Sequence, residues 1–427
     1  MTSEFDIVIL GLSITSSWGN GHATTYRGLT KGLSQLGYRT LFLERDAEWY
    51  ASNRDEPRPA GCVTAIYNGF AELVARFERA ISNARLVILG SYVPDGIEIA
   101  KWITSSSKGH TAFYDIDTPV TMALLKQNNA TYLSRELIPC FDAYFSFTGG
   151  PTLKKIERDF GSPMARALHC TVDQEIYRPV SANRTWELGY LGTYSADRQG
   201  ALEELLLEPA GRMSKSRFVV AGPQFPADIK WPANVDRMVH LSPGEHPGFY
   251  AAQRFTLNVT REAMKQAGYS PSVRLFEAGA CGAAIISDWW QGLDTIFEPG
   301  ADLLIAETAE DVCRYLRDTS DSARANIGAR VRSRVLAEHS PLARARQIEK
   351  YLGEMDDNVS SYSALRNGRG GQIRERVGAG AVSELNGHGA SQESGRSVIR
   401  AADTGRIHES AGASVKNSSG DRSASQD

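Results

Sequence analysis

The apolar residues in the first half of the chain fall into short runs, separated by stretches with helical spacing. The runs cover residues 5–12, 39–44, 85–90, 111–116 and 143–147. Between the first two runs, Leu29, Leu33 and Leu36 recur at the spacing of one helix face, and Gly37 follows as a stop signal. Strands that alternate with helices predict βαβ units, and therefore a parallel sheet covered by helices on both faces.

The same alternation restarts in the second half of the chain. Strand-like runs occur at residues 186–192, 217–222, 254–259, 283–287 and 302–305. The stretch between the two series, residues 176–186, contains a proline and several polar residues, as is typical of a connection between domains. The pattern therefore predicts an α/β fold of two successive domains, over residues 1–180 and 181–356.

The composition changes near Asp357. From there to the end, the chain is rich in Gly, Ser and Arg, and Tyr362 is its only aromatic residue. Such a segment cannot bury enough apolar surface to offset its chain entropy. We expect residues 357–427 to form a disordered tail.

Composition and charge exclude several classes of protein. The formal net charge of −3 over 427 residues gives no global electrostatic case for a nucleic-acid partner. The five cysteines are scattered without a CxxC pair, which argues against a disulfide framework or a structural zinc site and fits a reducing cytoplasm. No apolar run approaches the roughly 20 residues of a membrane helix, and the acidic N-terminus does not resemble a signal peptide. We expect a cytoplasmic protein with no integral membrane segment.

A glycine-rich loop, SSWGNGHATTYRGL at residues 16–29, follows the first predicted strand. Such a loop brings backbone N–H groups and a helix N-terminus to an anion. Gly19 and Gly21 fit the first two positions of the dinucleotide fingerprint GxGxxG, but the third position is Thr24. Glu44 ends the second strand, where a ribose-binding acid would stand. The incomplete fingerprint is a weak indication of NAD.

His22 in this loop suggests another chemistry. It lies at the start of the helix, at the mouth of an open α/β sheet where ligands bind. Its ordinary pKa suits acid–base work. The alternative is that His22 caps the helix or bonds within the loop, and the sequence leaves both open.

The stretch GYSPSVRLFEAGACGAAIISD, residues 268–288, predicts a second helix N-terminus that points out of a second sheet. Ser270 is placed to cap the helix, and Pro271 fits its first turn. Ser272 and free backbone amides would accept a diphosphate, Arg274 would add charge-assisted bonds, and Glu277 would accept bonds from ribose hydroxyls. Taken alone, the stretch also fits an ordinary capped helix.

With two further blocks, this stretch resembles the GT-B sugar-nucleotide glycosyltransferases, and within them the spore-maturation CgeB-like group. The blocks are GNGHATTYRGL near the start, LGYLGTYSADR at 188–198, and SPSVRLFEAGACGAAIISD followed by GLDTIFEPGADLL at 292–304. The resemblance covers roughly residues 5 to 350. It implies two Rossmann-like domains that face each other across a cleft, with the donor nucleotide in the C-terminal one.

The resemblance also implies roles for particular residues. Glu277 resembles the ribose-binding glutamate, and Arg198 is placed like the basic residue that binds donor phosphate. The phosphate-cradling loop meets its helix at Ser272, Val273 and Arg274. The N-terminal loop that meets the acceptor and the transferred sugar matches Gly19, Gly21 and His22.

The chain departs from the family pattern at one position. Many retaining relatives carry a first glutamate eight residues before the ribose-binding one, where this chain has Tyr269. That departure puts contact with the sugar hydroxyls, and retention of configuration, in question.

Asp115 and Asp117 form a DxD sequence, which in another glycosyltransferase class binds a divalent metal. They lie in the first half, away from the predicted phosphate site, so we expect no metal. We expect them instead to bind acceptor hydroxyls at the cleft, with capping of the helix near Thr118 as the alternative.

These observations predict a metal-independent, hexosyltransferase-like GT-B enzyme. It would move a sugar from a nucleotide-sugar, its co-substrate, to an unidentified acceptor, and it needs no other cofactor. His22 would be the base if configuration inverts, and would position the sugar if it is retained. The alternatives are a sugar-nucleotide epimerase and a non-catalytic surface or spore-coat assembly protein.

Overall fold

The computed structural model describes residues 4–18 and 20–368, with side chains up to residue 358. The described residues up to 364 form one compact unit. Gly19 and residues 369–427 of the expected tail lie outside the described residues. The remaining start of that tail, residues 357–368, belongs to a helix, so the change in composition does not mark the end of regular structure.

The first half contains a seven-stranded parallel sheet in the order β3-β2-β1-β4-β5-β6-β7. Its strands are β1 (Ile7–Gly11), β2 (Thr40–Arg45), β3 (Val63–Tyr67), β4 (Leu86–Gly90), β5 (His110–Asp115), β6 (Ala143–Ser146) and β7 (Ala165–Ala167). The helices between them are α1 (Gly21–Gln35), α2 (Glu48–Ala51), α3 (Phe70–Asn83), α4 (Gly96–Ser106), α5 (Thr118–Lys126), a 3-10 helix (Arg135–Cys140) and α6 (Pro151–Phe160).

The second half contains a six-stranded parallel sheet in the order β10-β9-β8-β11-β12-β13. Its strands are β8 (Trp186–Leu191), β9 (Phe218–Ala221), β10 (Val235–Met238), β11 (Gln253–Asn258), β12 (Ile285–Ser287) and β13 (Leu304–Ile305). The helices are α7 (Ala196–Leu202), a π-helical turn (Glu203–Leu207), α8 (Glu208–Arg212), α9 (His246–Ala251), α10 (Glu262–Ala267), α11 (Val273–Ala280), α12 (Ala309–Asp318) and α13 (Asp321–Glu338), with 3-10 turns at Pro243–Glu245 and Leu293–Thr295.

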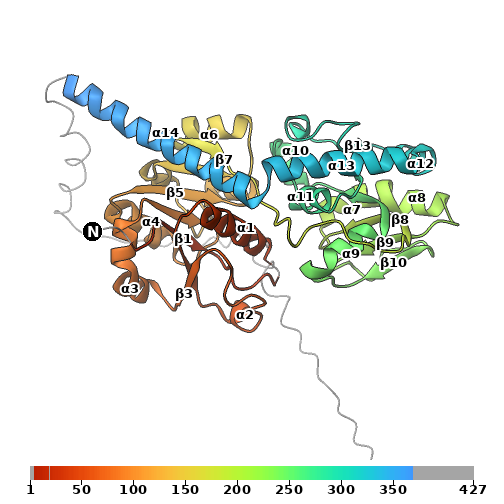
Figure 1. The fold of residues 1–427 in the computed structure, drawn as a ribbon, viewed down its shortest axis with the longest axis horizontal. Coiled ribbons are helices and arrows are strands. Elements are labelled where there is room, and N and C mark those ends of the chain that lie inside the picture. The colour runs from red at the N-terminus through yellow and green to blue at the C-terminus, as the bar shows by residue number, and fades with distance from the viewer. Residues whose placement is uncertain (1–3, 19, 369–427) are drawn as a thin grey trace, which may run out of the picture. The chain divides into compact units, whose positions relative to one another are not determined.

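Both sheets are covered on both faces, as the continuous apolar runs predict (Figure 1). In β1, Ile7 and Ile9 belong to one apolar cluster, whereas Val8 and Leu10 belong to the cluster on the other face. The first of these clusters continues into the second half through Leu275 and neighbouring residues. The two sheets therefore share part of one core. Each reverses its strand order beside its first strand, which is where doubly wound sheets bind ligands.

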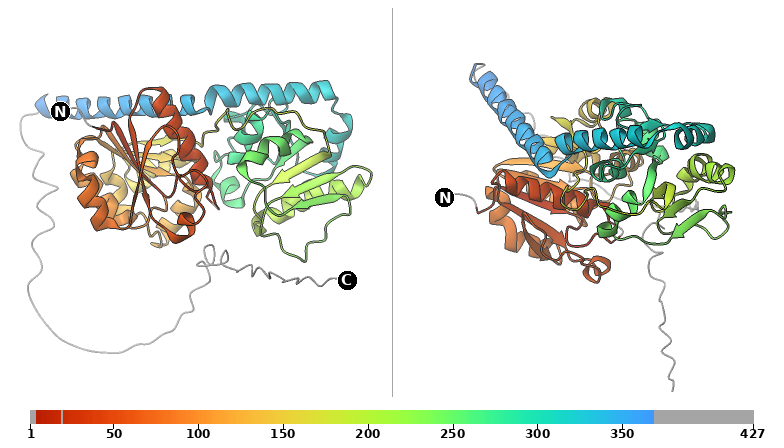
Figure 2. Two further views of the ribbon diagram at one scale, coloured as in Figure 1. Left: turned by 60° about the horizontal axis from the view of Figure 1, so that its bottom comes forward. Right: turned by 45° about the vertical axis from the view of Figure 1, so that its right-hand side comes forward.

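The last helix, α14 (Pro341–Gly368), returns from the second half to the first sheet, as both views in Figure 2 show. Tyr351 stacks on Phe145 of β6 with ring centroids 5.6 Å apart, and Arg166 pairs with Glu354 at 2.7 Å. A Cβ on Gly32 of α1 would lie only 1.9 Å from the Pro341 carbonyl oxygen, so glycine allows this close approach. Residues 341–356, which the sequence assigned to the second domain, thus pack on the first.

The apolar runs locate ten of the strands, and the three that they miss are β3, β7 and β10. All three are edge strands. Val63 in β3 is 55% exposed, and β10 buries only Val235. An edge strand has a solvent-facing side, so its sequence need not be continuously apolar.

Within the described residues, none of the helices is both long and apolar enough to span a membrane.

Candidate functional site

A cavity of about 500 Å³ lies between the two halves, beyond the carboxyl ends of their strands. Its first-half wall comes from the loops after β1, β5 and β6, and its second-half wall from the loops after β8, β9, β10 and β11 and from the start of α11. We call it the interdomain cavity. Among its lining residues are Asn20, Gly21, His22, Asp117, Tyr177, Arg198, His246, Arg261, Ser272, Val273, Arg274 and Glu277.

The loop between β1 and α1 is fixed by the carboxylate of Glu44 at the end of β2. Glu44 is fully buried and accepts hydrogen bonds from the Ile14 and Thr15 amides and from the Thr15 hydroxyl, at 2.7–3.0 Å. Both of its oxygens are therefore engaged within the protein. The interpretation of Glu44 as a ribose-binding acid of a dinucleotide site is wrong, because this carboxylate holds the loop instead.

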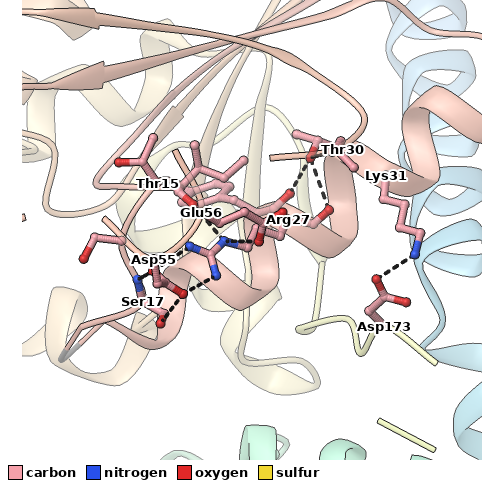
Figure 3. A network of polar contacts seen from close by, with 12 residues as sticks. Thr15, Ser17, Arg27, Thr30, Lys31, Asp55, Glu56 and Asp173 are labelled. Carbon is pink, nitrogen blue, oxygen red and sulfur yellow. Dashed lines mark hydrogen bonds and ion pairs between the residues drawn. The ribbon is translucent and has the colours of Figure 1, made fainter. Parts of the chain in front are cut away.

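A second carboxylate holds the outer part of the same loop (Figure 3). Asp55 accepts bonds from the amide and hydroxyl of Ser17 and a two-pronged contact from Arg27, whose Nε also bonds the Ile14 carbonyl. Burial opposes ionisation of Asp55, but the bonds from Arg27 and Ser17 outweigh it and lower its pKa to about 2. The loop is therefore held from both sides.

His22 lies in the wall of the interdomain cavity, in the first turn of α1. The helix cap is Asn20, whose side chain accepts from the His22 amide at 3.0 Å, so His22 does not cap α1. Its Nδ1 has no hydrogen-bond partner among the described residues. Burial lowers the pKa of His22 to about 4, so the ring is neutral at neutral pH and able to accept a proton.

The two carboxylates of the DxD sequence separate. Asp117 lines the interdomain cavity and accepts a bond from the Tyr92 hydroxyl at 3.2 Å. Asp115 is fully buried beneath it, bonded by the hydroxyls of Tyr144 at 2.5 Å and Thr121 at 2.7 Å. The expectation that Asp115 faces the acceptor is wrong, because its carboxyl joins β6 to α5 inside the core. Burial raises the pKa of Asp115 to about 7.

On the other wall, α11 begins two residues later than the sequence predicted. Its cap is Ser272, which accepts from the Arg274 amide at 3.4 Å. Ser270 is buried and instead accepts a bond from Thr148 of the first half at 3.0 Å. Ser272 and Val273 line the cavity, so the start of α11 faces it as predicted.

Arg198 and Arg274 give this wall its positive charge. The Arg198 Nη2 donates to the Thr193 carbonyl, and the Arg274 guanidinium lies 5.1 Å from the centre of the Tyr190 ring. The Nε of Arg198 and the Nε and Nη1 of Arg274 have no partner, and neither residue pairs with a carboxylate in the described part of the chain. Burial lowers the pKa of Arg198, and the nearby Arg274 charge adds to this effect. An anion is the complement that both arginines lack.

Glu277 lies one turn along α11 and contacts two residues that the sequence analysis missed. Its Oε1 accepts from the Tyr177 hydroxyl at 3.0 Å, and its Oε2 is 3.8 Å from His246 Nδ1. Burial opposes ionisation, but His246, Tyr177 and the Arg274 charge together lower the pKa of Glu277. Glu277 is therefore an oriented, ionised acceptor. Tyr177 lies in the connection between the sheets, where no local motif marks it.

Arg261 is a further lining residue that the sequence analysis did not select. It follows β11 and faces the first half. Burial raises the pKa of Asp117, and the Arg261 charge opposes this rise only in part. Its position just after a central strand of a parallel sheet is the sequence signal that could have identified it as a site residue.

Tyr269 lies outside the interdomain cavity. Its ring fills the space against Gly150 of the first half and Gly292 of the second, where a Cβ would come within 2.4 Å and 2.3 Å of ring atoms. Its carbonyl accepts a bond from the Gly149 amide at 2.8 Å. At the position of the missing glutamate, the chain thus has an interdomain contact.

No group of three or more His, Cys, Asp or Glu side chains able to hold a metal ion occurs among the residues that the structure describes. The polar groups that line the interdomain cavity include three arginines, Glu277 and a helix N-terminus on one wall, and a neutral histidine and a carboxylate on the other. Such a cavity can hold a diphosphate and bring a second molecule to it.

Comparisons with known proteins agree with this architecture. The sucrose-phosphate synthase of Thermosynechococcus elongatus superposes with a TM-score of 0.58 at 13% identity, over 83% of this chain and 100% of that one. HepE of Anabaena, in complex with UDP and glucose, gives 0.60 at 11% identity, over 82% and 100%. An alpha-glucosyltransferase in complex with UDP gives 0.60 at 11% identity, over 82% and 100%.

The chain has the GT-B fold. The family model described as glycosyl transferase-like matches residues 198–350, which hold the second-half wall of the cavity from Arg198 through Glu277. No curated protein sequence matches the chain. The resemblance to the CgeB-like group stays a prediction.

Proposed function

We propose that the protein is a glycosyltransferase that takes a sugar from a nucleoside-diphosphate donor bound at the start of α11. One observation carries the proposal. Arg198 and Arg274 face the same cavity as the capped N-terminus of α11, and neither has a carboxylate partner in the described part of the chain. The family model over residues 198–350 supports it.

The site residues suggest how the reaction would proceed. The donor diphosphate would lie against the α11 amides, Arg198 and Arg274, which stabilise the charge that develops on the leaving group. Because two guanidinium groups supply the positive charge that stabilises the leaving group, we propose a metal-independent transfer. Glu277, oriented by Tyr177, would accept hydrogen bonds from the ribose hydroxyls.

The first-half wall would serve the acceptor. His22 is neutral and lines the cavity, so it would accept the acceptor's hydroxyl proton if configuration inverts. Asp117 would orient a hydroxyl of the acceptor or of the sugar. We propose a hexose as the transferred sugar, because the neighbours named above include proteins in complex with UDP and glucose. The sequence blocks at 19–29, 188–198 and 270–304 support a place in the CgeB-like group.

The proposal is tested by the thermal stability of the full chain with UDP, GDP, dTDP, CDP or ADP, each with and without EDTA. A nucleotide at 100 times its Kd should stabilise the protein by about 2.7 kcal/mol. We expect one base to be preferred, with no effect of EDTA. Glu277→Gln should weaken binding roughly 10- to 100-fold, as expected for a charge-assisted bond worth about 1.5–3 kcal/mol.

Glu310→Gln, on the exposed surface of α12, is the matched control and should bind as the parent does. Stabilisation by none of the nucleotides in a folded protein would contradict the proposal and favour a non-catalytic role. Conversion of the donor sugar without an acceptor would instead identify an epimerase.

A further inference from the structure

A second cavity, of about 790 Å³, lies where α13 ends and α14 begins. Its walls come from the loops after β6 and β7, from Tyr269, from Thr295 and Ile296, and from residues 336–347. We call it the crossover cavity, because here the chain passes back to the first sheet. It shares no lining residue with the interdomain cavity.

The crossover cavity contains a buried positive charge without a counter-ion. Arg344 lines it, is only 3% exposed, and pairs with no carboxylate in the described part of the chain. Its Nη2 contacts the carbonyls of Cys170 and Glu338 and the Nδ1 of His339, and its Nη1 contacts Gln347. All four partners are neutral, and its Nε has no partner among the residues that the structure describes. Burying a charge in this way is costly unless an opposite charge is supplied.

The contact with Arg344 also sets the proton position on His339. A guanidinium can only donate, so at 2.7 Å the His339 Nδ1 must accept. Burial and the Arg344 charge lower the pKa of His339, so the ring is neutral and carries its proton on Nε2. That Nε2 is a donor in a residue only 4% exposed, and no described residue accepts its proton. His339 is also one of the residues that line the cavity.

The N-terminus of α14 lies at the same place. Pro341 has no N–H, and the Ala343 and Arg344 amides donate to Ser340, which leaves the Leu342 amide for a ligand. Ser340, Leu342 and Ala343 line the cavity, and α14 continues for 28 residues from Pro341. A helix N-terminus favours an anion. Glu338, the carboxylate in the lining, is 52% exposed and lies 3.7 Å from Arg334 Nη1. Its charge also acts on Arg344 and raises the pKa of that guanidinium, but less than burial lowers it.

We propose that the crossover cavity binds a small phosphate-bearing molecule, independently of the nucleotide donor. Phosphate offers several oxygens to donors that line one cavity, here the Arg344 Nε–H, the His339 Nε2–H and the Leu342 amide at the start of α14. The cavity is larger than a phosphate ion and has the size of sites for small organic ligands. A phosphomonoester of a sugar fits both properties.

The test is calorimetric titration of the full chain with inorganic phosphate and with glucose 6-phosphate, at constant ionic strength and saturating UDP. Arg344→Gln should weaken binding of both probes at least roughly tenfold, the loss expected for a charge-assisted bond. Lys350→Gln removes a charge from the same helix, outside the cavity, and should bind as the parent does. Arg198→Gln should also retain binding, which separates this site from the donor site.

Hydrogen exchange of the parent protein gives a second readout that does not depend on Arg344→Gln being folded. Either probe should protect the amides of residues 339–344. Tighter binding of glucose 6-phosphate than of phosphate would identify a phosphomonoester, and equal binding would identify phosphate itself. Absence of binding at millimolar concentration, binding that survives in Arg344→Gln, or binding without protection of 339–344 would overturn the proposal.

Discussion

The Tyr177 hydroxyl donates a hydrogen bond of 3.0 Å to Glu277 Oε1, joining the connection between the two sheets to the start of the proposed donor site. Tyr177 is 1% exposed, so the bond fixes the carboxylate before any ligand arrives. We expect Tyr177→Phe to weaken nucleotide binding roughly 3- to 10-fold, the effect of losing one hydrogen bond of about 1 kcal/mol. Calorimetric titration measures this. An unchanged Kd in Tyr177→Phe would show that Glu277 needs no such orientation.

The two unpaired arginines should serve the reaction more than the fold. We expect Arg274→Gln to lower kcat about 10²- to 10³-fold, as removal of one electrostatic contact to a developing charge does elsewhere. Its Tm should fall only slightly, because no ion pair is lost and only the longer-range attraction between Arg274 and the Glu277 carboxylate is removed. Steady-state kinetics and thermal unfolding check both statements. The control is Arg158→Gln on α6, whose side chain is 78% exposed; a comparable loss of kcat there would contradict the assignment.

The titration of His22 should not change the reaction rate near neutral pH. Because the pKa of His22 is lowered to about 4, its ring stays neutral from pH 6 to 8. His22 should therefore contribute no pH dependence to kcat/KM over that range. His22→Gln should lower kcat about 10²- to 10⁴-fold if His22 is the base, without changing nucleotide binding. A break near pH 6.5 that disappears in His22→Gln would show an unshifted histidine instead.

Asp115 should make stability depend on pH in an unusual direction. Its pKa is raised to about 7, whereas in the unfolded chain it titrates near 3.8, so the folded state holds the extra proton between these values. The parent should therefore lose stability relative to Asp115→Asn as pH rises from 5 to 7, by at most about 1.4 kcal/mol per pH unit, and the difference should then level off.

Denaturant unfolding of parent and Asp115→Asn at pH 5, 6, 7 and 8 measures this difference. Asp318→Asn, on an exposed carboxylate that pairs with Arg317, is the control and should show no such trend. A constant gap between parent and Asp115→Asn across this range would mean that Asp115 is ionised throughout.

The sequence was informative wherever burial is complete. A strand inside a parallel sheet is apolar on both faces, so β1, β4 and β5 stand out as continuous runs. The edge strands β3, β7 and β10 do not, because one side of each faces solvent or a loop. The start of α11 was recognisable because capping chemistry is local, and even there the cap was placed two residues early, at Ser270 instead of Ser272.

Contacts between distant residues could not be predicted in this way. Glu44 and Asp115 are carboxylates at strand ends, as functional residues often are. Their partners, Thr15 and Tyr144, each lie 29 positions away in the sequence and reach them only through the tertiary fold. His246 and Tyr177 contact Glu277 from other elements, and no spacing in the sequence predicts these contacts. Arg344 resembles any helix arginine until α14 is seen to bury it against Cys170 of the first half.

The return of α14 also determines when the first domain can form during synthesis. A ribosome that has released residues 1–180 has delivered all seven strands of the first sheet, but not Ile348, Tyr351, Leu352 or Met355, which are buried in the same apolar cluster as β1 and β6. The face of the sheet that α14 covers must wait until the entire second domain has been made. The N-terminal domain is therefore the first to be translated and the last to be completed, and it cannot be excised as one continuous segment.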